Sequence, residues 1–196
     1  IVKRVNGNGD DIIVVHGAGW AQVEVCGKEI NIVTLHTWPQ RYAYKAENQA
    51  ESGKNQEGDV FRAKEMKYIC DQTIGTVPDA ASQYWIMLGD FNAVSRVDNG
   101  IYGFDEDNKA FLVHDYVSGN TPYIDIVDRL HPGDFQKSTF SGRRIDFIYM
   151  TEPLFRKVRS AEIIHDGYPT ACRDPRGVTK FCYPSDHYPI IVNLKF

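Results

Sequence analysis

The chain has 196 residues, of which 42% are hydrophobic and 24% charged, and it carries a net charge of −4 with a pI near 5.9. This length and composition suit one globular domain with a sizeable core, so residues 1–196 are expected to form a single domain. A mildly acidic chain argues, though weakly, against a protein that grips many duplex phosphates through a broad basic surface.

The first part of the chain predicts a meander of β-strands that ends at a histidine. Apolar residues favour strands at three places: Asp11–Val15, Ala21–Cys26 and Glu29–Leu35. Gly17–Gly19 predicts a turn, and Gly27-Lys28 is typical of a two-residue hairpin connection. His36 follows the third strand directly, whereas His16 lies beside the turn and is interpreted as a solvated loop residue.

A polar stretch from Thr37 to Glu57 follows, and Trp38 is one of its few aromatic residues. Its ring would either stack on a substrate or pack against the next helix, and packing is slightly favoured. That helix is predicted from Asp59 to Ile74, because apolar residues recur there at steps of three and four and Gly75 follows as a stop.

The central stretch begins at Tyr84 and is a run of bulky apolar residues that ends at Gly89. Such a run is typical of a strand buried on both faces, and glycine then allows the backbone to turn. Asp90 and Asn92 would lie where the strand stops, which is where open α/β sheets bind ligands. An Asx turn that caps the strand is the alternative explanation of the same two residues.

Two later strands place ionisable groups where burial is expected. Asp146 lies within the apolar segment Arg143–Met150, and His187 immediately precedes the apolar run Ile190–Leu194. Because a buried lone carboxylate is costly, Asp146 and His187 are predicted to pair if their strands are neighbours. Three further elements are expected in this half of the chain: short helices at 108–116 and 152–158, and a strand at 160–165.

The ordered set of GDFN at 89–92, RRIDFIY at 143–149 and SDHYPI at 185–190 resembles the endonuclease/exonuclease/phosphatase family of metal-dependent phosphoesterases. The strand that ends in His36 resembles a fourth piece of the same pattern, so the likeness covers about Ile30 to Phe196. This resemblance implies an α/β four-layer sandwich, in which two mixed β-sheets pack face to face with helices outside.

The resemblance also implies a role for each matching residue. Hydrolysis of a phosphate ester needs an activated water, neutralised phosphoryl oxygens and help for the leaving oxygen. Asp186 is the expected ligand of Mg²⁺ or Mn²⁺, and Asp90 is expected to orient or deprotonate the water. The other expected roles are phosphoryl contacts from Asn92, His187 and His36, orientation of His187 by Asp146, and substrate contacts from Arg143, Arg144 and Trp38.

The front of the chain departs from the family pattern. The Asn-bearing strand and the metal-binding Glu that normally open the pattern are not found before His36, and Glu24 fits the solvent face of a hairpin strand better. We therefore expect the domain to be incomplete at its N-terminus, with self-association through an unpaired sheet edge as one consequence. A catalytically inactive binding module that lacks this ligand is the alternative from another class.

Within the enzyme class, the expected substrate is a phosphate ester in a nucleic acid, a phospholipid headgroup or a sugar phosphate. A phosphodiesterase or nuclease is favoured, and a phosphomonoesterase acting on a sugar or inositol phosphate is the alternative. A disulfide between Cys172 and Cys182 would favour a periplasmic or secreted protein, whereas Cys26 and Cys70 lie in apolar patterns and resemble buried thiols. No signal peptide or transmembrane run is recognisable in the sequence, and the compartment stays open.

Overall fold

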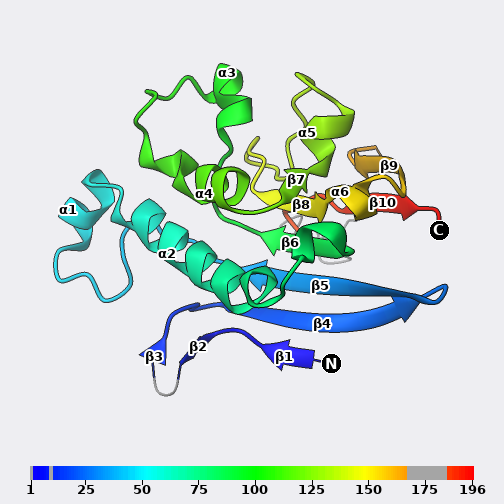
Figure 1. Cartoon of the computed structure of the whole chain (residues 1–196). Helices are drawn as coiled ribbons and strands as arrows, with labels where there is room; N and C mark the ends of the chain where they lie inside the picture. Colours follow the sequence, from blue (N-terminus) through cyan, green and yellow to red (C-terminus); the bar gives the residue numbers. More distant parts are fainter. Residues whose placement is uncertain (1, 9–10, 167–184) are drawn as a thin grey trace, which may run out of the picture.

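A six-stranded mixed sheet is the centre of the computed structural model, which describes residues 2–8, 11–166 and 185–196 (Figure 1). Its strand order is β1-β4-β5-β6-β8-β7, with β5 and β6 parallel and the other neighbours antiparallel. These strands are β1 (Val2–Arg4), β4 (Gly17–Val25), β5 (Lys28–His36), β6 (Trp85–Asp90), β7 (Tyr123–Asp125) and β8 (Asp146–Thr151).

Two smaller antiparallel pairs complete the described strands. One pair joins β9 (Val158–Ile163) to β10 (Ile190–Leu194), and the other joins β2 (Gly7–Asn8) to β3 (Asp11–Ile12). The helices are α1 (Gln49–Lys54), α2 (Glu57–Gln72), α3 (Asn99–Tyr102), α4 (Leu112–Asn120), α5 (Ile126–Leu130) and α6 (Glu152–Phe155), with 3-10 turns η1 (Ile74–Thr76), η2 (Ala80–Ser82), η3 (Arg96–Asp98) and η4 (Lys109–Phe111).

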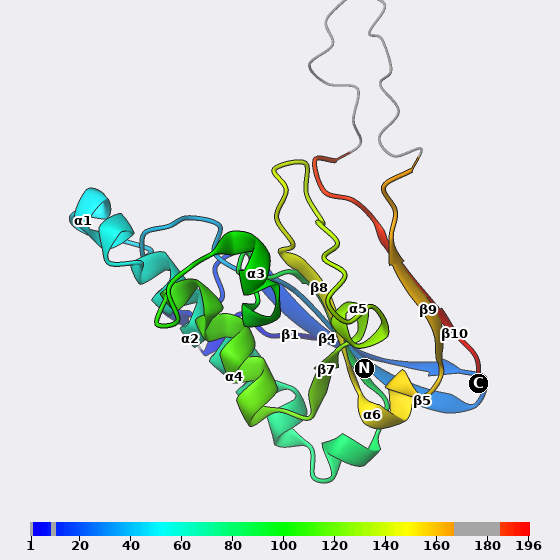
Figure 2. The same cartoon turned by 90° about the horizontal axis from the view of Figure 1, so that it is seen from above.

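The two faces of the main sheet are covered differently. Viewed from above, α2 and α4 lie on one side of the sheet and the β9–β10 pair lies on the other (Figure 2). Two buried clusters match this division. Met66 of α2 and Val113 of α4 pack with Met87 on the helical side, whereas Ile148 and Ala161 belong to the cluster beneath β9 and β10.

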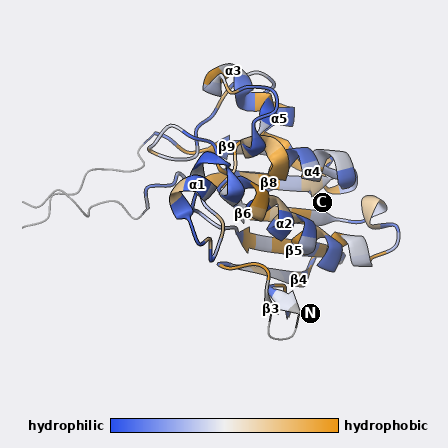
Figure 3. Cartoon of the chain, turned by 90° about the vertical axis from the view of Figure 1, so that its left-hand side faces the viewer, coloured by the Kyte–Doolittle hydropathy of each residue, from blue (hydrophilic) through white to orange (hydrophobic). Residues whose placement is uncertain are grey.

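Side-chain alternation explains why β8 serves both faces. Phe147 belongs to the helical cluster and Ile148 to the opposite one, as expected for successive residues of a strand. β8 is accordingly among the most hydrophobic segments of the ribbon, while α1 is hydrophilic (Figure 3). None of the helices in the described part of the chain is long and apolar enough to cross a membrane.

The structure corrects several predictions in the N-terminal part. The predicted turn at Gly17–Gly19 is the beginning of β4, and the predicted strand at Asp11–Val15 is reduced to the two residues of β3. The hairpin connection is Cys26-Gly27 rather than Gly27-Lys28, and both of its residues have positive φ, as a primed turn requires. Cys26 is therefore exposed at a loop tip instead of buried.

The long helix is shifted from its predicted position. It begins at Glu57, with Gln56 as its N-cap, so Asp59 lies in the first turn, where its carboxylate pairs with Arg62. Cys70 is buried on this helix, as predicted. The predicted pair of Cys172 and Cys182 lies outside the described residues.

Candidate active site

Strand register brings three of the predicted residues into one row at an edge of the main sheet. His36 of β5 pairs with Asp90 of β6, and Asp90 in turn pairs with Asp146 of β8. β5 and β6 end at this edge because they are parallel, whereas β8 begins there because it is antiparallel to β6. The Nε2 atom of His36 lies 3.6 Å from Oδ2 of Asp90.

Gly89 is required for this row to form. Its φ is +143°, and a Cβ atom at this position would lie 1.9 Å from the carbonyl oxygen of Leu35 in the neighbouring strand. A side chain would therefore push β5 and β6 apart at the point where His36 and Asp90 come together. The glycine of the GDFN motif thus has a steric role beside the two polar residues.

Asp146 and His187 form the predicted pair. Nδ1 of His187 lies 2.8 Å from Oδ2 of Asp146, and the same oxygen accepts a hydrogen bond of 2.7 Å from Oγ of Ser138. The prediction required that the strands carrying these two residues be neighbours, but β8 and β10 lie in different sheets. Instead, His187 precedes β10 and is brought to the site by an isolated bridge to Thr139.

The electrostatics of this pair favour a charged imidazole. Burial lowers the pKa of His187, but the carboxylates of Asp146, Asp90 and Asp186 together outweigh burial and the net pKa is raised. Burial raises the pKa of Asp146, opposed by Ser138 and His187, and the nearby Asp90 carboxylate adds to the rise. Because Nδ1 of His187 faces Asp146, its Nε2 atom is the nitrogen left for other contacts.

Asp90 and Asn92 form an Asx turn and also belong to the site. The backbone N–H of Asn92 donates to Oδ1 of Asp90 at 2.8 Å, and the Asn92 side chain donates to the carbonyl of Thr37 at 3.1 Å. Asn92 has a positive φ of 46°, which asparagine tolerates better than most residues. The Asx turn is thus confirmed, and it lies at the sheet edge where the sequence predicted a ligand site.

His16 lies beside this row and was missed by sequence reasoning. It is exposed, as predicted, but its ring contacts the edge of the His36 ring at a centroid distance of 4.5 Å and that of Trp38 at 5.9 Å. Trp38 also donates from its indole nitrogen to the carbonyl of Tyr42. It is thus a packed residue whose ring forms part of an aromatic surface next to His36.

A buried carboxylate fixes the two segments that carry His16 and Trp38, whose rings form the aromatic surface. Glu65 of α2 is 0% exposed, and its two oxygens accept hydrogen bonds from the backbone of Val15 at 3.0 Å and of Trp38 at 2.8 Å. Burial raises the pKa of Glu65 from 4.5 to about 7, although the two backbone donors and Arg62 oppose the rise. The helical pattern alone gave no sign of this role.

The two predicted arginines have different environments. Arg143 is exposed and lines a cavity of about 260 Å³ together with Asn92 and Arg41, a residue that the sequence did not single out. Arg144 is 2% exposed and forms ion pairs with Asp98 and Asp125. Its charge is thus already balanced, which makes it a poor phosphate ligand.

The carboxylates and His187 form a group suited to a cation. Ligand atoms of Asp90, Asp146 and His187 all lie within 4.8 Å of one another, whereas the Asp186 carboxylate is not part of this group. Asp186 is exposed and directly precedes His187 in the chain. Oxygen donors next to an imidazole are a donor set that Mg²⁺ or Mn²⁺ accepts, so the residues fit a divalent cation.

Comparisons with known proteins support the fold. No protein-family profile matches the sequence, and no curated protein matches it. Similar solved structures are an AP endonuclease from Archaeoglobus fulgidus (17% identity, TM-score 0.56), the 3′ phosphatase NExo from Neisseria bound to product DNA hairpin (14%, 0.56) and the human Nocturnin catalytic domain with bound sulfate anion (15%, 0.52).

These neighbours are members of the endonuclease/exonuclease/phosphatase family, and the chain shares their fold. Each match covers 90% of this chain, but only 65%, 65% and 53% of the respective neighbours. The chain therefore spans less than two thirds of their length. At this level of identity the likeness concerns the fold, so activity and substrate are a separate question.

Proposed function

We propose that this chain, which shares the fold of these phosphoesterases, hydrolyses a phosphate ester with the help of a divalent cation. The observation that carries the proposal is the convergence of Asp90, Asp146, His187 and His36 at one sheet edge, with Asn92 beside them. The wider arrangement that we propose is the four-layer sandwich, with helices outside both sheets.

Asp186 is the proposed ligand of Mg²⁺ or Mn²⁺, next to the group of Asp90, Asp146 and His187. The bound cation would neutralise phosphoryl charge and lower the pKa of a coordinated water. Asp146 is less available as a ligand, because its Oδ2 atom already contacts Ser138 and His187. Asp186 has its side chain exposed to solvent, where a hydrated cation can reach it.

The proposed roles of the other residues follow from their positions at this edge. Oδ2 of Asp90 has His36 at 3.6 Å and is placed to orient or deprotonate the attacking water. His187 carries a raised pKa, so its Nε2–H can donate to a phosphoryl oxygen, while Asp146 fixes the ring orientation. Asn92 and Arg143 both line the adjoining cavity and would contact the same phosphate.

The proposed substrate is a phosphodiester, as in a nucleic acid, with a phosphomonoester as the second candidate. The Neisseria neighbour, named as a 3′ phosphatase bound to product DNA, favours keeping the monoester in the assay. The experiment is a titration of Mg²⁺ and Mn²⁺ with bis-p-nitrophenyl phosphate and p-nitrophenyl phosphate as substrates. Relative rates on these two compounds separate the two candidates.

Two variants and one control complete the test. His187→Ala and Asp90→Asn are expected to abolish metal-dependent hydrolysis with little change in stability, because both side chains face the site rather than the core. Asp105→Asn, at an exposed position outside the row, is the matched control. Hydrolysis that survives in either site variant would assign the activity to another centre. If the wild-type chain shows no activity at any metal concentration, the inactive binding module is favoured.

A further inference from the structure

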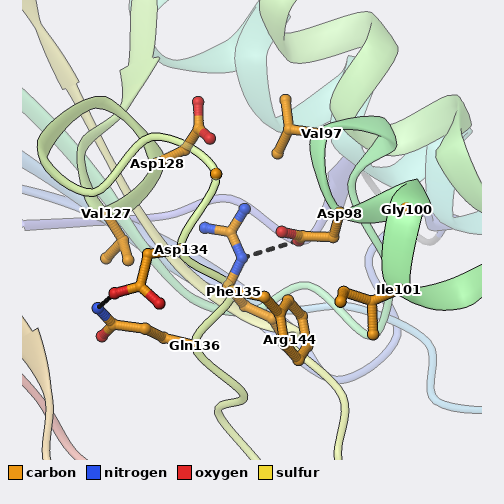
Figure 4. A pocket seen from close by; sticks show the side chains of 11 residues that line it. Val97, Asp98, Gly100, Ile101, Val127, Asp128, Asp134, Phe135, Gln136 and Arg144 are labelled. Carbon is orange, nitrogen blue, oxygen red and sulfur yellow. Dashed lines mark hydrogen bonds and ion pairs between the residues drawn. The ribbon is translucent and has the colours of Figure 1, made fainter.

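A second cavity, of about 340 Å³, is lined by Arg144, which belongs to the same segment as Asp146 (Figure 4). Its walls come from η3 and α3, from α5, and from the loop that leads to β8. Arg144 is among its lining residues and precedes Asp146 by two positions, so their Cα atoms are at most about 7 Å apart. One short backbone segment therefore contributes a residue to the cavity and a residue to the candidate active site.

Arg144 brings an unsatisfied hydrogen-bond donor to this cavity. Its Nε atom lies 2.9 Å from Oδ2 of Asp98 and its Nη1 atom 2.8 Å from Oδ2 of Asp125. Its Nη2 atom is buried and has no hydrogen-bond partner among the described residues. Figure 4 shows the terminal nitrogens directed away from Asp98, toward the side of Asp128. A buried donor without an acceptor is costly, which makes a bound acceptor favourable here.

The remaining charges in the wall are negative. Asp98 and Asp125 balance the guanidinium, and the carboxylates of Asp128 and Asp134 then remain. Asp134 has only a long contact of 3.5 Å with the Gln136 amide, and the described residues place no donor on the Asp128 carboxylate. A phosphate or another anion is disfavoured in this cavity, whereas a ligand with several N–H donors and one acceptor is favoured.

The rest of the wall suits a flat, apolar ring. Val97 and Ile101 are 58% and 61% exposed, which is unusual for large aliphatic residues, and both line the cavity. Phe135 lines it as well, and its ring is held edge-on by Tyr102 at a centroid distance of 5.8 Å. Aliphatic and aromatic side chains around a few polar atoms are typical of a small-molecule site.

We propose that this cavity binds a guanine base. The N1–H and N2–H₂ groups of guanine donate to the Asp128 carboxylate, its O6 or N7 accepts from Nη2 of Arg144, and its ring faces contact Ile101 and Phe135. Nη2 is covered by neighbouring atoms, so binding requires a side-chain rearrangement that uncovers this nitrogen. Guanine fits better than the other bases because it offers two adjacent donor groups to a carboxylate.

This inference deepens the proposed function and rests on it in one respect. If the candidate active site binds a phosphate at Asp90, that phosphate and the guanine at Arg144 belong to one nucleotide or one nucleic-acid strand. The base site itself is tested without a phosphate. Guanosine, adenosine, cytidine and uridine are titrated into the full chain by isothermal titration calorimetry. Guanosine is expected to bind about tenfold tighter than the other three, the discrimination typical of a well-formed pair of hydrogen bonds to a base.

Two variants alter the cavity without changing the proposed catalytic residues. A Cβ atom at Gly100 of α3 would meet nothing within 4 Å, so Gly100→Leu folds normally and fills the mouth; Gly119→Leu, in α4 and equally open, is the matched control. Asp128→Asn removes the carboxylate, with Asp105→Asn as control. Both cavity variants are expected to weaken guanosine binding about tenfold or more, while the controls bind like the wild type and all four hydrolyse bis-p-nitrophenyl phosphate at the wild-type rate.

The outcomes are distinguishable from those of the hydrolysis assay. Selective guanosine binding in a chain that hydrolyses nothing would support the base site and refute the proposed function. Equal binding of all four nucleosides, or none, would overturn the base site whatever the hydrolysis assay gives, and would leave water as the partner of Arg144. Binding of agmatine in preference to guanosine would also overturn it, because the cavity would then be a cation site.

Discussion

Glu65→Gln is the sharpest test of how the aromatic surface beside His36 is held. The buried carboxylate accepts from the backbone of Val15 and Trp38, and burial raises its pKa from 4.5 to about 7. The folded protein therefore binds this proton more tightly than the unfolded chain does. Stability from this group is present below pH 4.5 and is lost as the pH rises to about 7. A pKa difference of this size corresponds to about 3 kcal/mol of unfolding free energy.

The glutamine variant cannot titrate, so its stability relative to the wild type should change by about 3 kcal/mol between pH 4.5 and pH 7.5. A constant penalty of about 1 to 3 kcal/mol is expected in addition, because an amide oxygen satisfies only one of the two backbone donors. Urea unfolding followed by circular dichroism at several pH values measures both quantities.

Glu57→Gln is the control for this experiment, since Glu57 is exposed on the same helix. Its stability relative to the wild type should not vary with pH by more than about 0.5 kcal/mol. A stability difference between Glu65→Gln and the wild type that stays equally flat from pH 4.5 to 7.5 would refute the reasoning. The Glu65 carboxyl would then titrate alike in both states, and burial would not be its dominant influence.

Three further substitutions test the row of site residues and its support. Gly89→Ala places a Cβ atom against a backbone carbonyl of β5 at a residue with positive φ. It should therefore lower the unfolding free energy, measured by urea unfolding, by roughly 2 to 4 kcal/mol. A loss below about 0.5 kcal/mol would contradict this expectation. Asp146→Asn removes the carboxylate that contributes most to the raised pKa of His187, so this pKa should fall in a metal-free NMR titration. An unchanged value would refute the pairing. Asp98→Ala removes one ion-pair partner of Arg144 and should lower the unfolding free energy by about 3 to 5 kcal/mol. Stability near that of the wild type would show that this ion pair is dispensable.

The sequence predicted which polar residues would lie together better than it predicted the bounds of the elements that carry them. GDFN, the Asp146 segment and His187 could be recognised because each places a polar group within or beside a strongly apolar run. The structure brings Asp90, Asn92, Asp146 and His187 to one sheet edge. What the residues alone could not give was the route of His187, which reaches Asp146 through a bridge to Thr139 and not through a neighbouring strand.

Other features left no local signal in the sequence. His16 resembled a loop residue because its contact with His36 depends on the pairing of β4 with β5, in which Gly17 lies opposite His36. Glu65 looked like one polar residue of an amphipathic helix, since its partners lie 50 and 27 positions away in the chain. Arg144 differs from its neighbour Arg143 only in which face of the segment it occupies, and long-range packing decides that.

The row of His36, Asp90 and Asp146 depends on strand register to within one residue. A slip of one position between β6 and β8 would place Phe147 opposite Asp90 and turn the Asp146 side chain to the helical face of the sheet. The apolar residues of β8 prevent this, because Phe147 and Ile148 would then exchange the two cores that they fill. The hydrophobic alternation that stabilises the sheet is thus the same feature that sets the carboxylates opposite each other. The geometry of the candidate site therefore requires both buried clusters to be intact.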